Sequence, residues 1–439
     1  MYHLSFLFKN LKFLSIKIPY FCFLLFTMTK EQYQNAIEWL FVQMPNYQID
    51  GQKAYKPGLG NIIKLCNFFG NPQATLKTMH IGGTNGKGST SNMLASILQE
   101  QGYKVGLYNS PHLIDFTERI KVNGKNAEKT FVYDFIQRLK NLPETILPSF
   151  FEFTTIMAFE YFRQQNVDFA IIEVGLGGRL DSTNIIQPMI SAITNVALDH
   201  QNILGETIEE IAAEKAGIIK PDTPIISGDE NPLVKNIIRK KAEENTAQWI
   251  DATTISHQYE TDLQGKYQQK NIRVAIALIG ELKRMGITIS ESAIIHGLKN
   301  VQKNTNFIGR WYEFSQQPLT ICDTGHNQAG LEEVFAQLET MPQYKRIVLG
   351  FVNDKKIDEV LQILPKNAEY YFVKPSIFRG RPPKEYEEQL KKSGIKYKIF
   401  NEVNEGYLTA KQECMENEMI FIGGSNFVVG DFLEKNLVV

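Results

Sequence analysis

The chain has 439 residues, of which 43% are hydrophobic and 22% are charged. This length is too great for one compact core, so we expect two domains. The composition is that of an ordinary globular protein and excludes a largely disordered chain. The formal net charge of −1 gives no reason to expect a nucleic-acid partner, which would require a basic face.

Residues 1–27 differ from the rest of the chain because they are aromatic and apolar but interrupted by lysines. Their longest uncharged stretch, from Ile18 to Thr27, has ten residues, whereas a membrane-spanning helix needs about 20. No small-residue cleavage site of the kind found in signal peptides follows Phe26. We therefore predict that residues 1–27 are a non-native extension and that translation starts at Met28. A membrane anchor is the alternative interpretation.

From Met28 onward, regular elements follow one another. MTKEQYQNAIEWLF predicts an amphipathic helix. The expected strands are TMHIGGT, KVGLYNS, VDFAIIEVG (167–175) and MISAITNVALD (189–199), and the expected helices include SNMLASILQEQGY and TIEEIAAEKAGII (207–219). Near-continuous apolar strands are typical of a parallel sheet that is buried on both faces. Residues 28–302 are therefore predicted to form a doubly wound α/β domain.

A second α/β region follows a polar linker at Gln302 to Asn306. Its expected strands are PLTICDT, YKRIVLGF, AEYYFVK, IKYKIF and EMIFIGG, and its helices include QAGLEEVFAQLET. This alternation predicts a smaller, Rossmann-like domain at residues 303–439. The four cysteines of the chain, Cys22, Cys66, Cys322 and Cys414, include no CxxC pair, so we interpret them as reduced thiols of a cytoplasmic protein.

Residues 80–90, HIGGTNGKGST, form a glycine-rich turn between an expected strand and an expected helix. In a phosphate loop, backbone N–H groups at a helix N-terminus point at the anion, a lysine neutralises charge and a hydroxyl ligates magnesium. The usual spacing is GxxxxGK[ST], whereas here Gly88 separates Lys87 from Ser89. A turn that binds no nucleotide is the alternative, but the lysine and the hydroxyl favour a nucleotide triphosphate.

Acidic residues and a histidine follow at positions that a magnesium–phosphate site could use. Glu173, Asp199 and His200 come at the ends of expected strands, where ligands bind in parallel sheets. Glu152 is expected at the start of a buried helix, where a carboxylate needs a cation or hydrogen bonds. Each residue alone is more simply explained as a structural polar group. Their expected convergence on the edge that carries the loop favours a site.

Lys215 lies in the middle of an expected helix, in AAEKAGII. Taken alone, it is more simply a surface lysine that pairs with Glu209, Glu210 or Glu214, which are near it on the helix. The composition of the helix does not decide between this role and a role in the site.

Taken together, these motifs resemble the folylpolyglutamate synthase/dihydrofolate synthase family, within the Mur-ligase-like ATP-dependent amide ligases. The motifs are GTNGKGST (83–90), NSPHLIDFTERIKVNG (109–124), EVGLGGRLDSTN (173–184), ITNVALDHQNILGETIEEIAAEKAGIIK (193–220) and a box formed by Asp323, His326 and Asn327. The resemblance extends over residues 28–439, and the motifs are specific as a set.

The resemblance implies roles for particular residues. It implies an ATP site formed by Gly83, Thr84, Asn85, Gly86, Lys87, Gly88, Ser89, Thr90, Asn271, Arg310, Asp323 and His326. It assigns the ligands of two magnesium ions to Ser89, Glu152 and His200. It makes Lys87, His200 and a carbamylated Lys215 the catalytic residues, and it places the pterin substrate near Ser110, His112, Thr117 and Arg119. Asp354 and Lys355 resemble a further stretch of the family.

By the same resemblance, the chain is expected to be an ATP-dependent ligase of folate biosynthesis. It would add L-glutamate to dihydropteroate, to a reduced folate or to both, through an acyl phosphate. We expect a cytoplasmic monomer without membrane or nucleic-acid partners. The alternatives are a P-loop kinase or NTPase, another Mur-type amino-acid ligase with a non-folate carboxylate substrate, and a non-catalytic nucleotide-binding module attached to a membrane through residues 1–27.

Overall fold

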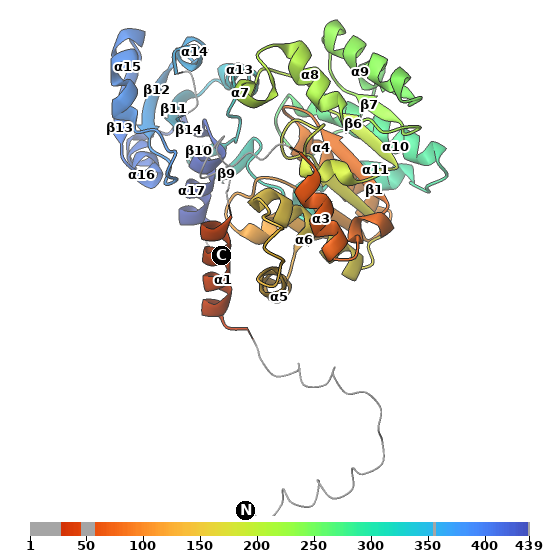
Figure 1. The fold of residues 1–439 in the computed structure, drawn as a ribbon. Coiled ribbons are helices and arrows are strands. Elements are labelled where there is room, and N and C mark those ends of the chain that lie inside the picture. Colours follow the sequence, from red (N-terminus) through yellow and green to blue (C-terminus); the bar gives the residue numbers. More distant parts are fainter. Residues whose placement is uncertain (1–27, 45–57, 354–356, 438–439) are drawn as a thin grey trace, which may run out of the picture.

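The computed structural model describes residues 28–44, 58–353 and 357–437. The predicted extension 1–27 and the residues Asp354 and Lys355 lie outside these ranges. Two sheets organise the described chain, and Figure 1 shows the smaller unit in blue beside the larger one. Among the described residues, no helix combines the length and the apolar character that crossing a membrane would require.

The first sheet has eight strands in the order β4-β3-β2-β5-β1-β6-β7-β8. The strands are β1 (Thr78–Gly82), β2 (Val105–Tyr108), β3 (Ile120–Val122), β4 (Lys125–Asn126), β5 (Phe169–Glu173), β6 (Ile190–Ile193), β7 (Ile225–Ser227) and β8 (Trp249–Asp251). β3 pairs antiparallel with both β2 and β4, and all the other pairings are parallel. β1, β5 and β6 are therefore central neighbours whose carboxyl ends meet at one edge.

Helices cover both faces of this sheet because successive strand residues point to opposite sides. Ala170 and Ile172 of β5 face one core, whereas Phe169 and Ile171 face the other. The first core is covered by α1 (Lys30–Gln43), α3 (Gly60–Phe68), α5 (Lys129–Leu139) and α6 (Phe150–Gln164). The second is covered by α4 (Lys87–Glu100), α10 (Gln268–Arg284), α11 (Glu291–Lys299) and α12 (Val301–Thr305).

Further helices complete this unit. Beside β6 and β7 lie α8 (Ile208–Ala216) and α9 (Pro232–Glu244), which share a third small core. The remaining helices of this unit, within the residues that the structure describes, are α7 (Gln201–Leu204) and the 3-10 helices η2 (Pro72–Thr75), η3 (Phe116–Arg119), η4 (Ser182–Ile185) and η5 (Ala252–Thr254).

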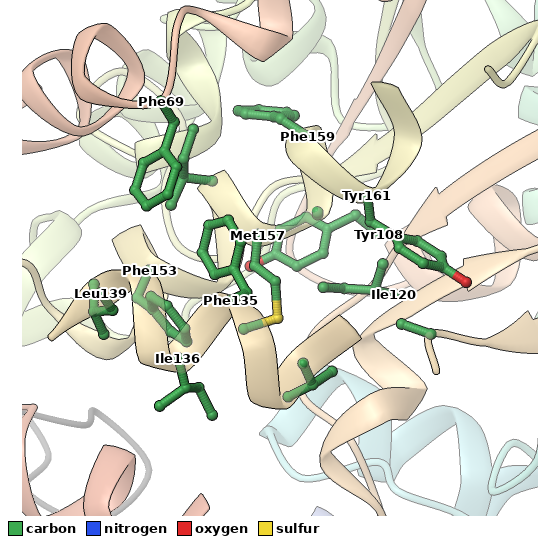
Figure 2. Close-up of a cluster of buried hydrophobic side chains, with 14 of the residues drawn as sticks. Phe69, Tyr108, Ile120, Phe135, Ile136, Leu139, Phe153, Met157, Phe159 and Tyr161 are labelled. Atoms are coloured by element: carbon green, nitrogen blue, oxygen red, sulfur yellow. The ribbon is translucent and has the colours of Figure 1, made fainter. Parts of the chain in front are cut away.

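An aromatic cluster fixes α6 against the sheet and against α5, as Figure 2 shows. Phe153, Met157 and Phe159 of α6 are fully buried in it, together with Phe135 of α5. The rings of Phe135 and Phe153 lie 5.5 Å apart. Since buried aromatic residues contribute large apolar areas, this packing makes α6 a rigid wall beside the carboxyl end of the sheet.

The second sheet has six strands in the order β13-β12-β11-β14-β10-β9. They are β9 (Tyr312–Gln316), β10 (Leu319–Cys322), β11 (Tyr344–Leu349), β12 (Ala368–Val373), β13 (Lys396–Phe400) and β14 (Glu418–Gly423), and only β9 is antiparallel. One face is covered by α13 (Gln328–Glu339), α14 (Ile357–Gln362), η6 (Pro383–Tyr386) and α15 (Glu387–Ser393). The other is covered by α16 (Val403–Glu413) and α17 (Asn426–Asn436).

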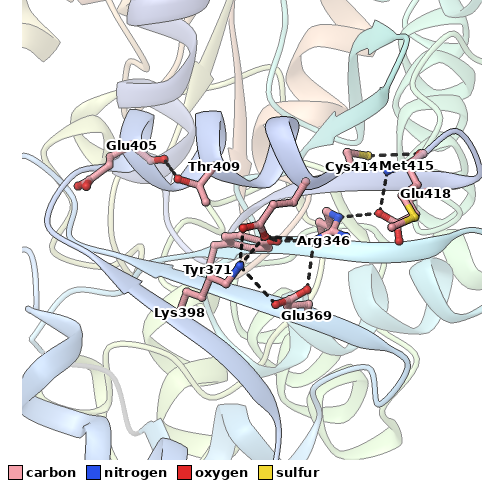
Figure 3. Close-up of polar contacts among 10 residues, drawn as sticks. Arg346, Glu369, Tyr371, Lys398, Glu405, Thr409, Cys414, Met415 and Glu418 are labelled. Carbon is pink, nitrogen blue, oxygen red and sulfur yellow. Dashed lines mark hydrogen bonds and ion pairs between the residues drawn. The ribbon is translucent and has the colours of Figure 1, made fainter.

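A charged network joins the strands of this sheet near their amino ends, as Figure 3 shows. The side chain of Arg346 is 7% exposed and pairs with Glu418 at 2.6 Å and with Glu369 at 3.1 Å. Lys398 pairs with Glu413 on the neighbouring α16. Because buried charges must be paired, this network is a structural element of the sheet. It leaves the carboxyl ends of the strands for the site.

The predicted fold class, a parallel-sheet phosphate-loop domain followed by a smaller α/β domain, is confirmed. The sequence patterns did not predict β3, β4, β7, β8 and β9, which have two to five residues each. β6 ends at Ile193, so Asp199 and His200 lie in the loop beyond the strand rather than at its end. The expected linker, Gln302 to Asn306, falls largely within α12, which packs against α4.

Candidate active site

A cavity of about 400 Å³ lies between the two units, a size typical of ligand pockets. From the first sheet it is lined by the loop after β1 and by the segments that follow β5 and β6. From the second it is lined by residues before β9, after β10 and around the start of α17. α7 and α13 lie at the junction of the two units (Figure 1).

The loop at residues 83–86 adopts a conformation that requires glycine at two positions, both with positive φ. Gly83 has φ +140°, and a side-chain carbon there would lie 2.0 Å from the hydroxyl of Thr194. Gly86 has φ +84°, and a side-chain carbon would lie 2.2 Å from Oδ1 of Asn271. Only glycine fits both positions, because other residues disfavour this backbone and would collide. The glycines thus let the loop pack closely on its neighbours.

The loop ends where α4 begins at Lys87, so the N–H groups of the first helical turn are available to an anion. The ammonium of Lys87 donates to the carbonyl oxygens of Gly83 and Thr84, both at 3.1 Å. The hydroxyl of Ser89 accepts a hydrogen bond of 3.2 Å from the buried amide of Gln268. Every residue from Gly83 to Ser89 lines the cavity, whereas Thr90 is buried behind it.

Glu173, the last residue of β5, is the buried carboxylate next to this loop. Its Oε2 accepts hydrogen bonds from the side chain of Asn109 at 2.9 Å and from the backbone N–H of Ser110 at 3.1 Å. Its Oε1 lies 3.8 Å from where a side-chain carbon on Gly88 would stand. Burial raises the pKa of Glu173, while the positive charge of Lys87 opposes that rise. A cation here would hold the carboxylate in its charged form.

Glu152 is in a different place. It is the third residue of α6, and its carboxylate accepts a hydrogen bond of 2.7 Å from the backbone N–H of Ser149 in a capping box. Ser149, Phe150 and Phe151 line the cavity, but Glu152 does not. The structure therefore does not bring Glu152 to the phosphate loop, and Glu173 is the carboxylate found there. The signature of the cap, S-x-x-E, was readable in the sequence.

His200 lines the cavity from the loop after β6. It precedes α7 with a left-handed backbone, φ +51°. The neighbouring carboxylate of Asp199 lies 3.9 Å from Nε2 of His200 and 3.6 Å from Nε2 of His326. Since His326 belongs to the second unit, Asp199 stands between two histidines that come from opposite sides of the cavity.

Lys215 is buried, with 4% of its surface exposed. Its ammonium donates a hydrogen bond of 2.9 Å to the carbonyl oxygen of Gly83. Burial, with a smaller contribution from Lys87, lowers its pKa to about 7. Of its supposed surface partners, Glu214 pairs instead with Arg179. The interpretation of Lys215 as a surface lysine is therefore wrong, and the structure brings it to the phosphate loop.

The second unit contributes Arg310, Asp323 and His326 to the cavity, as expected, and Asn271 lines it from α10. Asp323 accepts hydrogen bonds from the backbone N–H of Trp311 at 2.7 Å and from the hydroxyl of Tyr267 at 2.5 Å. Tyr267 precedes α10, so this second bond connects the two units.

Of the residues expected at the pterin substrate, Ser110 and Arg119 line the cavity. The guanidinium carbon of Arg119 lies 5.2 Å from the ring centre of Phe150, and its Nε donates to Nδ1 of His112 at 2.8 Å. Burial beside this cation lowers the pKa of His112 to about 3, so His112 is neutral at physiological pH. His112 and Thr117 lie behind the cavity wall, where His112 positions Arg119 and Thr117 bonds Asp115.

The residues at the loop fit a magnesium ion bound together with phosphates. Among the described residues, no group of three or more histidine, cysteine, aspartate or glutamate side chains forms a metal cluster by itself. Magnesium bound with a nucleotide usually has few protein ligands because phosphates and water supply the others. Ser89, Glu173 and His200 provide a hydroxyl, a buried carboxylate and an imidazole around the loop. This donor set is compatible with such an ion.

Comparison with known proteins identifies the family of the chain. The Mur ligase middle domain matches residues 81–281, and the Mur ligase glutamate ligase domain matches residues 309–426. The chain therefore has the middle and C-terminal domains of a Mur-type ligase. It is 32% identical to the dihydrofolate synthase/folylpolyglutamate synthase of Bacillus subtilis over 438 residues, which is 92% of this chain and 99% of that protein. The chain belongs to the dihydrofolate synthase/folylpolyglutamate synthase family.

Solved structures show the same fold. A bifunctional folylpolyglutamate synthase/dihydrofolate synthase with Mn, AMPPNP and L-glutamate bound has a TM-score of 0.79 at 27% identity, covering 92% of this chain and 98% of that one. The FolC protein of Escherichia coli in complex with DHPP and ADP has a TM-score of 0.78 at 28% identity, covering 91% and 97%.

Proposed function

We propose that this chain is an ATP-dependent ligase that joins the amine of L-glutamate to the carboxylate of dihydropteroate and of reduced folates. One observation carries the proposal within this family. A single cavity brings together the phosphate loop, the buried carboxylate of Glu173, the substrate-side residue Arg119 and the Asp323–His326 box of the second unit. A nucleotide, an acid substrate and an amine could therefore meet there.

The chemistry requires activation, because a carboxylate is a poor electrophile. A carboxylate oxygen attacks the γ-phosphorus of ATP, the bond to ADP breaks, and an acyl phosphate forms. The glutamate amine then attacks the acyl carbon, inorganic phosphate leaves with the bonding electrons, and the amine loses a proton. Catalysis of such steps depends on positioning and charge stabilisation more than on protein nucleophiles.

Lys87 and the first turn of α4 are the main protein groups for the phosphates. On ATP binding, the Lys87 ammonium would exchange the carbonyl oxygens of Gly83 and Thr84 for phosphate oxygens. The helix N-terminus would add backbone N–H groups. Arg310, Asp323 and His326 close the other side of the cavity and would exclude water, which would otherwise hydrolyse the acyl phosphate.

Ser89, Glu173 and His200 are the residues that would hold magnesium, and we propose that the site takes two ions. Bound magnesium would neutralise charge on the phosphoryl group during its transfer. We further propose that Lys215 is carbamylated. Its pKa of about 7 makes the neutral amine available at physiological pH, and the product would supply an anion in place of a cation beside Lys87.

Phosphate release tests the proposed function directly. The chain would be mixed with ATP, magnesium and glutamate, and dihydropteroate or tetrahydrofolate would be added in separate reactions. We expect stimulation by both substrates. Stimulation by one alone would restrict the enzyme to that substrate, whereas ATP hydrolysis that needs neither acid nor glutamate would favour an NTPase. No stimulation by either acid would refute the proposal.

We also propose that the enzyme acts as a monomer in the cytoplasm. Sedimentation analysis at micromolar concentration would test the first statement, and a species of twice the chain mass would contradict it. Fractionation of cells that produce the native protein would test the second, and recovery with the membranes would contradict it.

A further inference from the structure

Two asparagines from opposite units form a reciprocal hydrogen-bonded pair beside the cavity, where the two units meet. Nδ2 of Asn85, in the phosphate loop, donates to Oδ1 of Asn327 at 3.1 Å. Nδ2 of Asn327 donates back to Oδ1 of Asn85 at 3.0 Å. Asn327 is the residue immediately before α13, so the second unit is bonded directly to the loop that would hold the phosphates.

Asn327 has no hydrogen-bonding capacity left over. Its Nδ2 also donates to Asp199 at 2.9 Å, and its Oδ1 also accepts from the backbone N–H of Gly330 at 2.9 Å. A side-chain amide offers two donors and two acceptor positions, and all four are used here. The residue is 4% exposed. A rotated amide would set an oxygen against Asp199 and an N–H against the N–H of Gly330, so only one orientation is possible.

Asn85 is bonded to the first unit by its backbone and to the second by its side chain. Its backbone N–H donates to Oδ1 of Asn195 at 2.8 Å, and its carbonyl oxygen accepts from the hydroxyl of Thr194 at 2.6 Å. The partner of Asn327 on the other side, Asp199, directly precedes His200. The position of α13 is thus transmitted both to the phosphate loop and to the segment that carries His200.

We propose that Asn327 is a positioning residue that couples the placement of the C-terminal unit to the shape of the phosphate loop. When the two units are together, Asn327 fixes the side chain of Asn85 and the carboxylate of Asp199 in the arrangement that receives the nucleotide. This inference rests on the proposed function only in that the cavity binds ATP. It adds that ATP affinity depends on a contact that joins the two units.

The substitution Asn327→Asp distinguishes the proposed positioning role of Asn327 from its role as the N-cap of α13. Aspartate still offers an oxygen to the N–H of Gly330, and it is as good an N-cap as asparagine. The substitution removes both donor bonds and places a carboxylate against Asp199. We expect the affinity for AMPPNP with magnesium, measured by calorimetry at a temperature where the variant is folded, to fall about tenfold. Gln328→Ala is the matched control, because Gln328 bonds only Glu332 on the exposed face of α13.

Exchanging donor and acceptor provides a rescue. Asp199→Asn combined with Asn327→Asp allows the amide at position 199 to donate to the carboxylate at position 327. We expect the double variant to bind AMPPNP several-fold more tightly than the two single losses predict when added. Such coupling between substitutions reports a direct interaction and not two independent structural effects.

Two results with the substituted chains would overturn the inference. One is an Asn327→Asp chain that binds AMPPNP within twofold of the unsubstituted chain, and the other is strict additivity in the double variant. Because binding is measured without folate or glutamate, failure of the unsubstituted chain to ligate glutamate would refute the proposed function, but the binding test of this inference would still be valid. Failure of the unsubstituted chain to bind AMPPNP would overturn both.

Discussion

The ammonium of Lys215, on α8, lies 2.9 Å from the carbonyl oxygen of Gly83 and donates a hydrogen bond to it. A lysine from a helix far along the chain is therefore part of the phosphate loop's surroundings. Its burial beside Lys87 disfavours the charged form, which is why its pKa is about 7 instead of the ordinary value of 10.5. Only a neutral amine reacts with carbon dioxide, so this environment suits carbamylation.

Lys215→Ala is expected to lose most of the ligase activity, and a small carboxylate such as acetate should restore part of it. In the unsubstituted chain, carbon-13 bicarbonate should give a carbamate signal in NMR spectra that weakens as the pH falls below 7, since the amine is then protonated. Lys220→Ala is the control, because Lys220 lies on the same segment but bonds Asn184 outside the cavity. Full activity of Lys215→Ala, or an unchanged carbamate signal in it, would contradict the proposal.

Glu173→Gln and Glu152→Gln distinguish the two candidate carboxylates. Glu173→Gln removes a buried negative charge next to the phosphate loop, and we expect activity to fall at least about a hundredfold. Glu152→Gln should keep its activity and stability, because glutamine also completes a capping box with Ser149. The comparison needs turnover at saturating magnesium and a thermal unfolding curve for each variant. A large loss of activity in Glu152→Gln with little loss in Glu173→Gln would instead favour Glu152 as the metal ligand.

Gln268→Leu tests how the hydroxyl of Ser89 is oriented. The amide of Gln268 donates to Ser89 and accepts from Asn271, and it is fully buried. Losing this support should raise the magnesium concentration needed for half-maximal activity by about tenfold or more, as for other residues behind a metal ligand. The neighbouring Gln269 is exposed, so Gln269→Leu should leave the magnesium dependence unchanged. Equal magnesium titrations of the two variants would show that Gln268 has no such role.

Gly88→Ala tests why an extra glycine stands between Lys87 and Ser89. A side-chain carbon at Gly88 would meet only ordinary contacts, the closest at 3.6 Å from the ring of Phe307, and its φ is not positive. Without a nucleotide, alanine therefore fits at this position, and the stability of the protein should be unchanged or slightly higher, because alanine favours the helix. Binding of AMPPNP should weaken about tenfold if the phosphates approach this backbone closely.

Gly86→Ala is the contrasting variant for this experiment. Its positive φ and the collision with Asn271 should lower the thermal unfolding midpoint even without a nucleotide. If Gly88→Ala bound the analogue as tightly as the unsubstituted chain, the extra glycine would have no part in receiving phosphate.

The sequence was sufficient for features that depend on neighbouring residues. The apolar runs predicted β1, β2, β5, β10, β11, β12, β13 and β14 near their observed bounds. The spacing of Gly83, Gly86 and Lys87 identified the phosphate loop, because a strand, a turn and a helix N-terminus are all encoded locally. Short strands such as β7 and β8 have too few residues to show a period, so their pairing depended on the sheet.

Choosing between Glu152 and Glu173 required the tertiary structure. Both are buried acids close to apolar segments in the sequence, and only the folded chain shows that Glu173 lines the cavity whereas Glu152 does not. Taken alone, Lys215 was more simply a surface lysine, and only the resemblance assigned it to the site. The folded chain places its ammonium against the loop.

The contact between Asn85 and Asn327 joins residues that are 242 positions apart. No local pattern encodes such a pair, since helix and strand periodicity, helix caps and turns relate only residues that are near one another in the sequence. The sequence by itself determined the elements and the chemical groups at their ends, because those follow from backbone geometry and burial within a few residues. Which groups meet across the cavity was decided only when the two cores packed and brought their strand ends together.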